Sequence, residues 1–445
     1  MDMAGQIRNR INSFQIIIAG FALVILLGAL LLMLPLSSAD RTVTGFDDAL
    51  FTSVSAVCVT GLVVRDTASY WSYFGQAVIL TLIEIGGLGV IVVAVMFSKV
   101  SGRKISLLQR QTLQGAISAH QMGGLVNLTG FIVKTALLFE AAGALIMMPV
   151  MCGRYGADGI WMAVFHAVSA FCNAGFDLMG TRTGHYSSLT SFSSDPVICL
   201  TVSALIMVGG IGFLTWRDIA EHKWRIHLFR MQSKVILTMT FLLIALPAAF
   251  FFWGDFAELP LGERICASLF QAVTPRTAGF NTVEISEMSS AGRAMITGLM
   301  LVGGAPGSTA GGMKITTLAV LLGNVSSVFV QKENVRFFRR RVDDTAVKSA
   351  ATIMTLYILL FGAGGFAISS LENITMEMCL FETASAIGTV GLSLGMTPTL
   401  GSMSRIILMS LMFLGRVGSL TFIMAAVSGR IAVPSQYPVE KIMVG

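Results

Sequence analysis

Long apolar runs, separated by shorter and more polar stretches, dominate the sequence. A helix of about 20 apolar residues spans a bilayer, and runs of that length lie at 14–36, 73–98, 127–150, 196–216, 233–253, 291–329, 348–370 and 402–428. They predict eight transmembrane helices and an all-α polytopic membrane protein. The first run is too long for a signal-peptide core and more membrane sequence follows it, so we expect it to be retained.

A shorter segment of another kind lies between the two runs of each successive pair. Each holds about twelve mostly apolar residues and then a small-residue tract that ends in glycine and a bulky apolar residue: 46–64, 161–178, 264–282 and 376–394. The four glycines are separated by 114, 104 and 112 residues. This spacing indicates four repeats of helix, re-entrant pore loop and helix, in the units 14–98, 127–220, 233–329 and 348–428.

Composition and charge place this pattern in a membrane with a defined orientation. Residues are 54% hydrophobic and 12% charged, whereas soluble domains carry about 25% charged residues. With the N-terminus inside, the inner segments hold 19 Lys and Arg against 7 acidic residues, and the outer segments hold 8 against 15. Basic residues favour the cytoplasmic side, so we expect both termini in the cytoplasm and no nucleic-acid partner.

Two spans per unit give all four units the same orientation, with the short segments entering from outside. Inverted repeats, common in secondary transporters, would require an odd number of spans in each unit. Four parallel units around one axis predict a pseudo-fourfold pore. The outer acidic excess would concentrate cations at its mouth.

The tract at the end of each short segment is suited to hold a dehydrated cation. Non-helical backbone is tolerated at membrane depth where protein buries it or where it lines a watery path. Helix C-terminal ends carry partial negative charge, and glycine lets successive carbonyls turn toward an ion. The expected potassium filter, which is also the expected K⁺ site, comprises Cys58, Val59, Thr60, Gly61, Cys172, Asn173, Ala174, Gly175, Arg276, Thr277, Ala278, Gly279, Gly388, Thr389, Val390 and Gly391.

A plain helix C-cap is the alternative explanation for each glycine. Four glycines at equivalent positions, each after a half-span helix, favour the filter. Among the four tracts, Thr389-Val390-Gly391 resembles the core of a potassium-channel filter, and the others differ from it. We therefore expect symmetry that is only approximate, and selectivity looser than in a potassium channel.

The run 291–329 is interrupted at its middle by LVGGAPGSTAGGMKI, residues 301–315. A phosphate-binding loop requires lysine directly after its second glycine, but here Met313 precedes Lys314 and no strand leads into the segment. A kink without function is the other alternative. The related bends at 83–89, 207–212 and 413–418 are milder and are explained by close helix packing.

Since only the third unit carries so long an interruption, we hypothesise a mobile gate beneath the filter. Its residues are Gly303, Gly304, Ala305, Pro306, Gly307, Ser308, Thr309, Ala310, Gly311 and Gly312, together with Lys314 and Arg416. Arg416 lies halfway along the last run, where an arginine faces a water-filled cavity or a partner. We expect it to pair with loop carbonyls or to repel cations, with an acidic partner as the alternative.

No pattern of catalytic or metal-binding residues emerges from the remaining sequence. The six cysteines lie in or beside apolar runs, and the five histidines are scattered. They show none of the spacings typical of metal enzymes. We expect no enzyme, and no cofactor in this chain.

The motifs TPRTAGFNT (274–282) and GGAPGSTAGGMK (303–314), the four filter glycines and Arg416 resemble the membrane subunits (KtrB) of Ktr-type potassium transporters. The superfamily also includes Trk and the plant HKT transporters. The resemblance extends over the whole chain. A start directly at the first repeat favours Ktr over Trk, and short loops favour a bacterial protein.

The resemblance implies a subunit of the bacterial cell membrane that conducts K⁺. Gly61 occupies the position where some HKT members carry serine and prefer sodium, so potassium passage is implied here. A homodimer with one pore per protomer, a cytoplasmic KtrA-like ring that senses ATP and ADP, and sodium-stimulated uptake are implied as well. The alternative function is a sodium-coupled carrier with alternating access.

Overall fold

The computed structural model describes residues 13–101, 111–115 and 125–418 of the chain, and helices account for nearly all of its regular structure. The α-helices follow one another as α2 Ser13–Leu32, α3 Phe46–Val57, α4 Thr67–Tyr70, α5 Tyr73–Leu88, α6 Val90–Val100, α8 Leu125–Tyr155, α9 Asp158–Phe171, α10 Gly180–Thr183, α11 Pro196–Gly210, α12 Phe213–His222, α13 Met231–Trp253, α14 Leu261–Val273, α15 Ser290–Met300, α16 Ile315–Phe329, α17 Asp344–Glu372, α18 Met376–Gly388 and α19 Ser402–Val417. Short 3-10 turns lie at Pro35–Ser37, Thr190–Phe192, Ile226–Leu228, Ile285–Glu287 and Thr397–Thr399.

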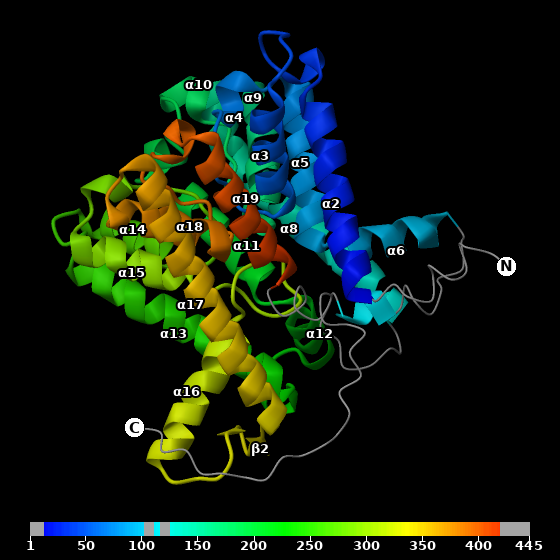
Figure 1. The fold of residues 1–445 in the computed structure, drawn as a ribbon, viewed down its shortest axis with the longest axis vertical. Helices are drawn as coiled ribbons and strands as arrows, with labels where there is room; N and C mark the ends of the chain where they lie inside the picture. Colours follow the sequence, from blue (N-terminus) through cyan, green and yellow to red (C-terminus); the bar gives the residue numbers. More distant parts are fainter. Residues whose placement is uncertain (1–12, 102–110, 116–124, 419–445) are drawn as a thin grey trace.

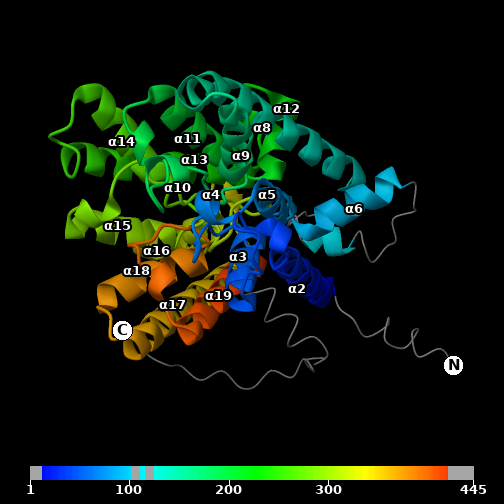
Figure 2. The ribbon, with the colours of Figure 1, turned by 90° about the horizontal axis from the view of Figure 1, so that it is seen from above.

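Four groups of helices lie around a common centre. Each group contains a long first helix (α2, α8, α13 or α17), a short helix of 12 to 14 residues (α3, α9, α14 or α18) and a second helix (α5, α11, α15 or α19). Seen from above, the blue, cyan-green, light-green and orange segments take separate sectors of the molecule (Figure 2). In Figure 1, α2, α3 and α5 stand upright beside one another, whereas α13, α14 and α15 run across the opposite side of the molecule.

Local sequence explains where several of these helices begin. Asp195 caps α11, since its carboxylate accepts hydrogen bonds from the N–H groups of Val197 and Ile198 at 3.0 and 3.3 Å, and Pro196 fills the first helical position. Ser72 caps α5 in the same way, accepting from the Gly75 N–H. These caps satisfy backbone donors that have no partner inside the helix.

Membrane length is reached by four single helices, α2, α8, α13 and α17, within the described part of the chain. The pairs α5 with α6 and α11 with α12 pass the same test when combined, but they bend by 95° and 96°. The predicted runs 73–98 and 196–216 therefore each contain two helices, and the break lies at or next to the glycine bends noted at 83–89 and 207–212. Gly89 and Gly212, with φ of 92° and 90°, lie directly before the second helix of each pair, and a residue with positive φ cannot continue the first helix.

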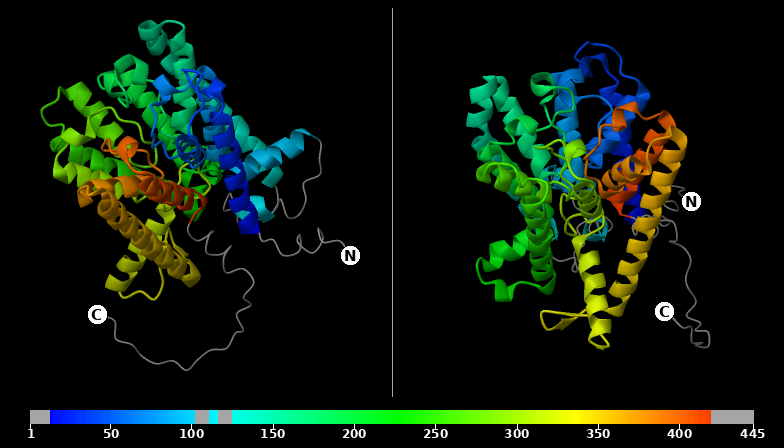
Figure 3. Two further views of the ribbon diagram at one scale, coloured as in Figure 1. Left: turned by 45° about the horizontal axis from the view of Figure 1, so that its top comes forward. Right: turned by 90° about the vertical axis from the view of Figure 1, so that its left-hand side faces the viewer.

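The third unit contains a longer break, as its sequence predicts. Helix α15 ends at Met300, fourteen residues follow without helix, and α16 begins at Ile315. Helices α16 and α17 then project together from the rest of the fold (Figure 3). At their far end the two-residue strands β1 Arg336–Phe337 and β2 Arg340–Arg341 pair antiparallel. The last predicted run, 402–428, is helical as α19 to Val417, and residues 419–428 lie outside the described residues.

The protein core surrounds the four short helices. The bulky residue that follows each repeat glycine is fully packed: Leu62, Phe176, Phe280 and Leu392 are each at most 1% exposed. Long helices instead expose large apolar side chains, such as Leu26 on α2, Leu137 on α8 and Leu359 on α17. Apolar residues on the outside and small residues in the centre are the distribution expected in lipid.

Candidate functional site

Four glycines from distant parts of the chain form a closed ring. A Cβ atom added to Gly61 would lie 2.5 Å from the carbonyl oxygen of Ala174, and one added to Gly175 would lie 2.7 Å from that of Ala278. The corresponding distances are 2.2 Å from Gly279 to Val390 and 2.2 Å from Gly391 to Thr60. Each glycine thus contacts the backbone of the next unit, and the fourth unit contacts the first.

These four positions also require glycine for their backbone conformation. The φ angles of Gly61, Gly175, Gly279 and Gly391 are 89°, 69°, 80° and 96°. An L-residue would meet both the unfavourable φ and the collision with the neighbouring carbonyl. The ring therefore depends on the absence of four side chains.

Two residues before each glycine the backbone takes a second left-handed turn that the sequence analysis did not foresee. Val59, Asn173, Thr277 and Thr389 have φ of 56°, 58°, 74° and 51°. Positive φ is rare for β-branched residues, and three of these four are β-branched. The repetition of such a strained conformation at four equivalent sites indicates a constrained and functional segment.

Hydroxyl side chains at the end of the short helices hold these turns, and sequence reasoning missed them. Ser55 and Ser385 accept hydrogen bonds from the N–H groups of Gly61 and Gly391 at 3.1 and 3.0 Å. Ser169 donates to the Phe176 carbonyl and Thr274 to the Phe280 carbonyl, both at 2.7 Å. The available signal was a serine or threonine five or six positions before every repeat glycine.

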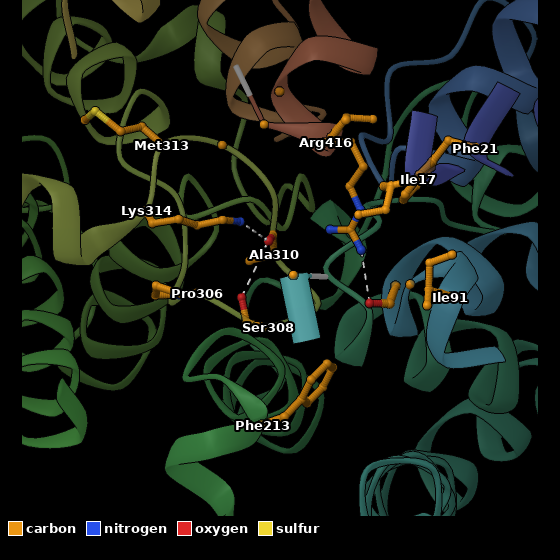
Figure 4. Close-up of a pocket in the computed structure, with 18 of the residues that line it drawn as sticks. Ile17, Phe21, Ile91, Phe213, Pro306, Ser308, Ala310, Met313, Lys314 and Arg416 are labelled. Carbon is orange, nitrogen blue, oxygen red and sulfur yellow. Dashed lines mark hydrogen bonds between the residues drawn. The ribbon is translucent and has the colours of Figure 1, made fainter. Parts of the chain in front are cut away.

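Two cavities adjoin this centre. One of about 460 Å³ is lined by the four ring glycines and by outer-loop residues that include Asp66, Asp177 and Glu284. The other, of about 360 Å³, is lined by the interrupting loop, Lys314, Arg416 and the bends after α5 and α19 (Figure 4). The ring glycines therefore face the first cavity and the loop faces the second.

The loop 301–314 packs against the second and fourth units. The N–H groups of Ala305 and Thr309 donate to the carbonyls of Gly210 and Gly209, at the end of α11, over 2.9 and 3.3 Å. Thr309 Oγ1 donates to the Phe171 carbonyl at 3.0 Å. A Cβ added to Gly311 would lie 2.1 Å from Thr389 Oγ1, so the loop touches the turn that precedes Gly391.

Both predicted cationic residues reach this loop. Lys314 Nζ donates to the Ala310 and Gly311 carbonyls at 2.9 and 3.3 Å. Arg416 donates from Nη1 to the Thr309 carbonyl and from Nη2 to the carbonyls of Gly86 and Gly87. Their side chains enter the same space from opposite sides (Figure 4), and the partners found for Arg416 are carbonyl oxygens.

The milder glycine bends allow close helix packing, as the sequence predicts, and they also leave backbone carbonyls without a partner inside the helix. Gly86, Gly209 and Gly415 do pack tightly, since an added Cβ would lie 2.1, 2.0 and 2.1 Å from the carbonyls of Val57, Phe171 and Ile387. These carbonyls belong to the last turn of the short helices. The following bends, however, end helices and free carbonyls that the loop and Arg416 use, which the sequence-based interpretation did not include.

The half-buried Glu84 and the buried Glu140 adjoin the second turn. Glu84 Oε2 lies 3.4 Å and Glu140 Oε1 lies 4.0 Å from Cys172 Sγ. These three residues could offer ligand atoms to a metal. Glu84 lines neither of the two central cavities and instead borders an apolar groove between α5 and α8.

The outer cavity contains one carboxyl group with a perturbed acidity. Burial raises the pKa of Asp177 to about 7, and the nearby Asp66 carboxylate raises it further. The hydrogen bond that Asp177 Oδ1 accepts from the Met179 N–H, at 2.9 Å, opposes this shift. The charge at this mouth therefore changes near neutral pH.

Comparisons with known proteins agree with this geometry. The family model described as "TrkH: Cation transport protein" matches residues 3–436. The potassium/sodium uptake protein NtpJ of Enterococcus hirae is 39% identical over 100% of this chain and 99% of its own length. The Ktr system potassium uptake protein B of Bacillus subtilis is 36% identical over 92% of each chain. The crystal structure of the potassium transporter TrkH from Vibrio parahaemolyticus superimposes with a TM-score of 0.74, at 17% identity, over 94% of this chain and 85% of that one.

The helices and these matches define a multi-pass membrane protein that transports cations and is not an enzyme. The chain belongs to the TrkH family of cation transport proteins, of the Ktr/Trk type. The resemblance seen in the sequence motifs is thereby confirmed. The roles expected for individual filter and gate residues stay predictions.

Proposed function

We propose that this chain is the potassium-conducting membrane subunit of a bacterial uptake system, with K⁺ crossing at the glycine ring. The closed contact of Gly61, Gly175, Gly279 and Gly391 is the observation that carries this proposal. A ring of backbone carbonyls at membrane depth can replace the hydration shell of a cation. The relatives named above carry potassium in their printed names, which supports K⁺ as the transported ion.

In this proposal the four helix groups are pore repeats and their strained turns form the filter. The carbonyl groups of the residues between each left-handed turn and its glycine provide the ion ligands. Because the four tracts differ in sequence, the ligand field is not fourfold symmetric. A filter with unequal strands fits transport that discriminates K⁺ from Na⁺ less strictly than a symmetric filter does.

The loop of residues 303–312 is the proposed gate of this pore. It touches the filter turn at Thr389, it lines the inner cavity, and Lys314 and Arg416 hold its carbonyls. The positive guanidinium of Arg416 next to the loop opposes the passage of a cation while the loop is in this arrangement. Displacing the loop removes the steric barrier and breaks the hydrogen bond between Arg416 and Thr309.

The remaining parts of the proposal concern assembly and location. We place the chain in the bacterial cell membrane with both termini in the cytoplasm, as the charge asymmetry favours. The phrase "Ktr system" in the names of three relatives supports a system of several components. We propose a homodimer bound to a cytoplasmic KtrA-like ring that carries the ATP or ADP, with uptake that depends on sodium.

Electrophysiology of the full chain in planar bilayers tests the proposal. Purified protein is recorded with K⁺ or Na⁺ as the main cation, with and without the regulatory ring. We expect currents through single open pores that are larger with K⁺ and that depend on the ring. Saturable flux with a fixed Na⁺:K⁺ stoichiometry and no single-channel current would reject the pore and support the sodium-coupled carrier.

A further inference from the structure

The residue immediately before each left-handed filter turn differs strongly among the four units. These residues are Cys58, Cys172, Arg276 and Gly388. None of them lines the outer or the inner central cavity. All four are buried, and each lies at the C-terminal end of a short helix or within three residues after it.

Arg276 is the one charged residue among these four positions, and it is buried. Only 6% of its surface is exposed. Its Nη2 lies 3.5 Å from Thr240 Oγ1 on α13, the long first helix of the third unit. The guanidinium therefore points away from the ring and toward the outer helix.

No carboxylate compensates this charge within the described part of the chain. The hydrogen bond to Thr240 is long, and Arg276 Nε has no hydrogen-bond partner. Arg293 and Arg405, by contrast, form ion pairs with Glu377 and Asp48 at 2.9 Å. A buried, uncompensated guanidinium is strongly unfavourable, so its presence beside the filter calls for a functional reason.

The equivalent positions in the other units have no such positive charge. Cys58 is a buried thiol, and Cys172 lies beside the carboxyl groups of Glu84 and Glu140. At Gly388 a side chain has no room, since a Cβ would lie 2.2 Å from the Met300 carbonyl. Arg276 is thus the only one of these four equivalent positions that carries a charged side chain.

We propose that Arg276 is a determinant of cation affinity, because its fixed charge behind the third filter strand lowers the occupancy of the filter by K⁺. This inference rests on the proposed function of the ring. Conduction requires that an ion bind well enough to enter and weakly enough to leave. A unit charge about 10 Å away, at an effective dielectric constant of about 20, changes an equilibrium constant on the order of tenfold.

The test measures the K⁺ concentration dependence of uptake by the full chain reconstituted in liposomes. Arg276→Met removes the charge and keeps much of the volume, and Arg276→Lys keeps the charge. We expect Arg276→Met to lower the half-saturating K⁺ concentration about tenfold and to lower the maximal rate, because ions leave more slowly. Arg276→Lys places an ammonium group at the same position, and its half-saturating K⁺ concentration should lie nearer to that of the parent protein than to that of Arg276→Met.

Substitutions at Thr240 supply the matched controls. Thr240→Val removes the long hydrogen bond but leaves the charge, so half-saturation should not change. Thr240→Asp adds a compensating carboxylate next to an intact Arg276 and should shift half-saturation in the same direction as Arg276→Met. It keeps the inference testable if Arg276→Met does not fold.

Two results would overturn the inference. One is an unchanged half-saturation in Arg276→Met or in Thr240→Asp. The other is an equal effect of Arg276→Met and Arg276→Lys, which would indicate a packing role. The variant Gly279→Ala tests the filter separately. If it loses the discrimination between K⁺ and Na⁺ while either of these results is found, only the inference on Arg276 fails. If it behaves like the parent protein, the proposed filter itself is rejected.

Discussion

Arg416 Nη2 donates a hydrogen bond of 3.0 Å to the carbonyl oxygen of Gly87. The two residues are 329 positions apart, on the second helix of the last unit and on that of the first. The same guanidinium donates to Thr309 in the loop of the third unit. One side chain thus connects three of the four units at the level of the proposed gate.

Removing this guanidinium should open the pore in the absence of the partner. Charge-assisted hydrogen bonds contribute about 1.5–3 kcal/mol each, so losing the one to Thr309 should favour loop displacement by about tenfold or more. We expect Arg416→Met to raise partner-free K⁺ flux into liposomes accordingly. Arg405→Met on the same helix, which breaks an outer ion pair with Asp48, is the control. Equal flux in the two variants would show that the hydrogen bond between Arg416 and Thr309 does not hold the gate closed.

Adding one methyl group to the loop should disturb its fit beneath the filter. A Cβ on Gly311 would lie 2.1 Å from Thr389 Oγ1 and 3.0 Å from Thr389 Cβ. Overpacking of this kind costs about 1–3 kcal/mol, so Gly311→Ala should increase partner-free flux by at least about fivefold. In the same unit Gly298 has open space around it, and Gly298→Ala should behave like the parent protein. Unchanged or lower partner-free flux in Gly311→Ala would contradict the proposed role of the loop as a gate.

Two glycines with similar φ allow the effect of backbone strain to be separated from the effect of a steric collision by an added side chain. Gly279 and Gly395 have φ of 80° and 87°, but an added Cβ at Gly279 lies 2.2 Å from the Val390 carbonyl whereas one at Gly395 meets nothing within 4 Å. Gly279→Ala should abolish the preference for K⁺ over Na⁺ in bilayer recordings. Gly395→Ala should cost about 1–2 kcal/mol of stability and leave that preference intact. If both variants conduct normally, the ring is not the filter.

The raised pKa of Asp177 predicts a pH-dependent uptake. Acidification of the outside from about pH 8 to pH 6 protonates this carboxyl group, removes a negative charge from the outer cavity and should lower uptake at limiting K⁺ severalfold. Asp177→Asn should have low uptake at both pH values. Glu284→Gln removes another charge from the same cavity and should keep the pH step; a pH step that survives in Asp177→Asn would contradict the assignment.

The raised pKa of Asp177 also predicts how the stability of the fold changes with pH. The folded state holds this proton up to about pH 7, while an unfolded aspartate loses it near its ordinary value of 3.8. The folded state binds more protons between these values, so the contribution of Asp177 to stability falls as pH rises from about 4 to 7. Thermal unfolding in detergent, compared between the parent protein and Asp177→Asn, measures this contribution.

Local patterns in the sequence predict the helical membrane class, the four short segments and the long break in the third unit. These features follow from local rules: apolar runs of membrane length predict helices, and glycine with proline in the middle of such a run predicts an interruption. The spacing of Gly61, Gly175, Gly279 and Gly391 was visible in the chain alone. Their closure into a ring depends on contacts between units that are more than 100 residues apart.

The contacts between the four units depend on the tertiary structure. The left-handed turns at Val59 and Thr389 oppose the local preference of β-branched residues, so no propensity could predict them. The carbonyls of Gly86 and Gly87 are available to Arg416 because α5 ends beside them, and only the fold brings Arg416 to this end. The uncompensated position of Arg276 has the same origin, because the sequence shows a charge but the fold determines which groups surround it.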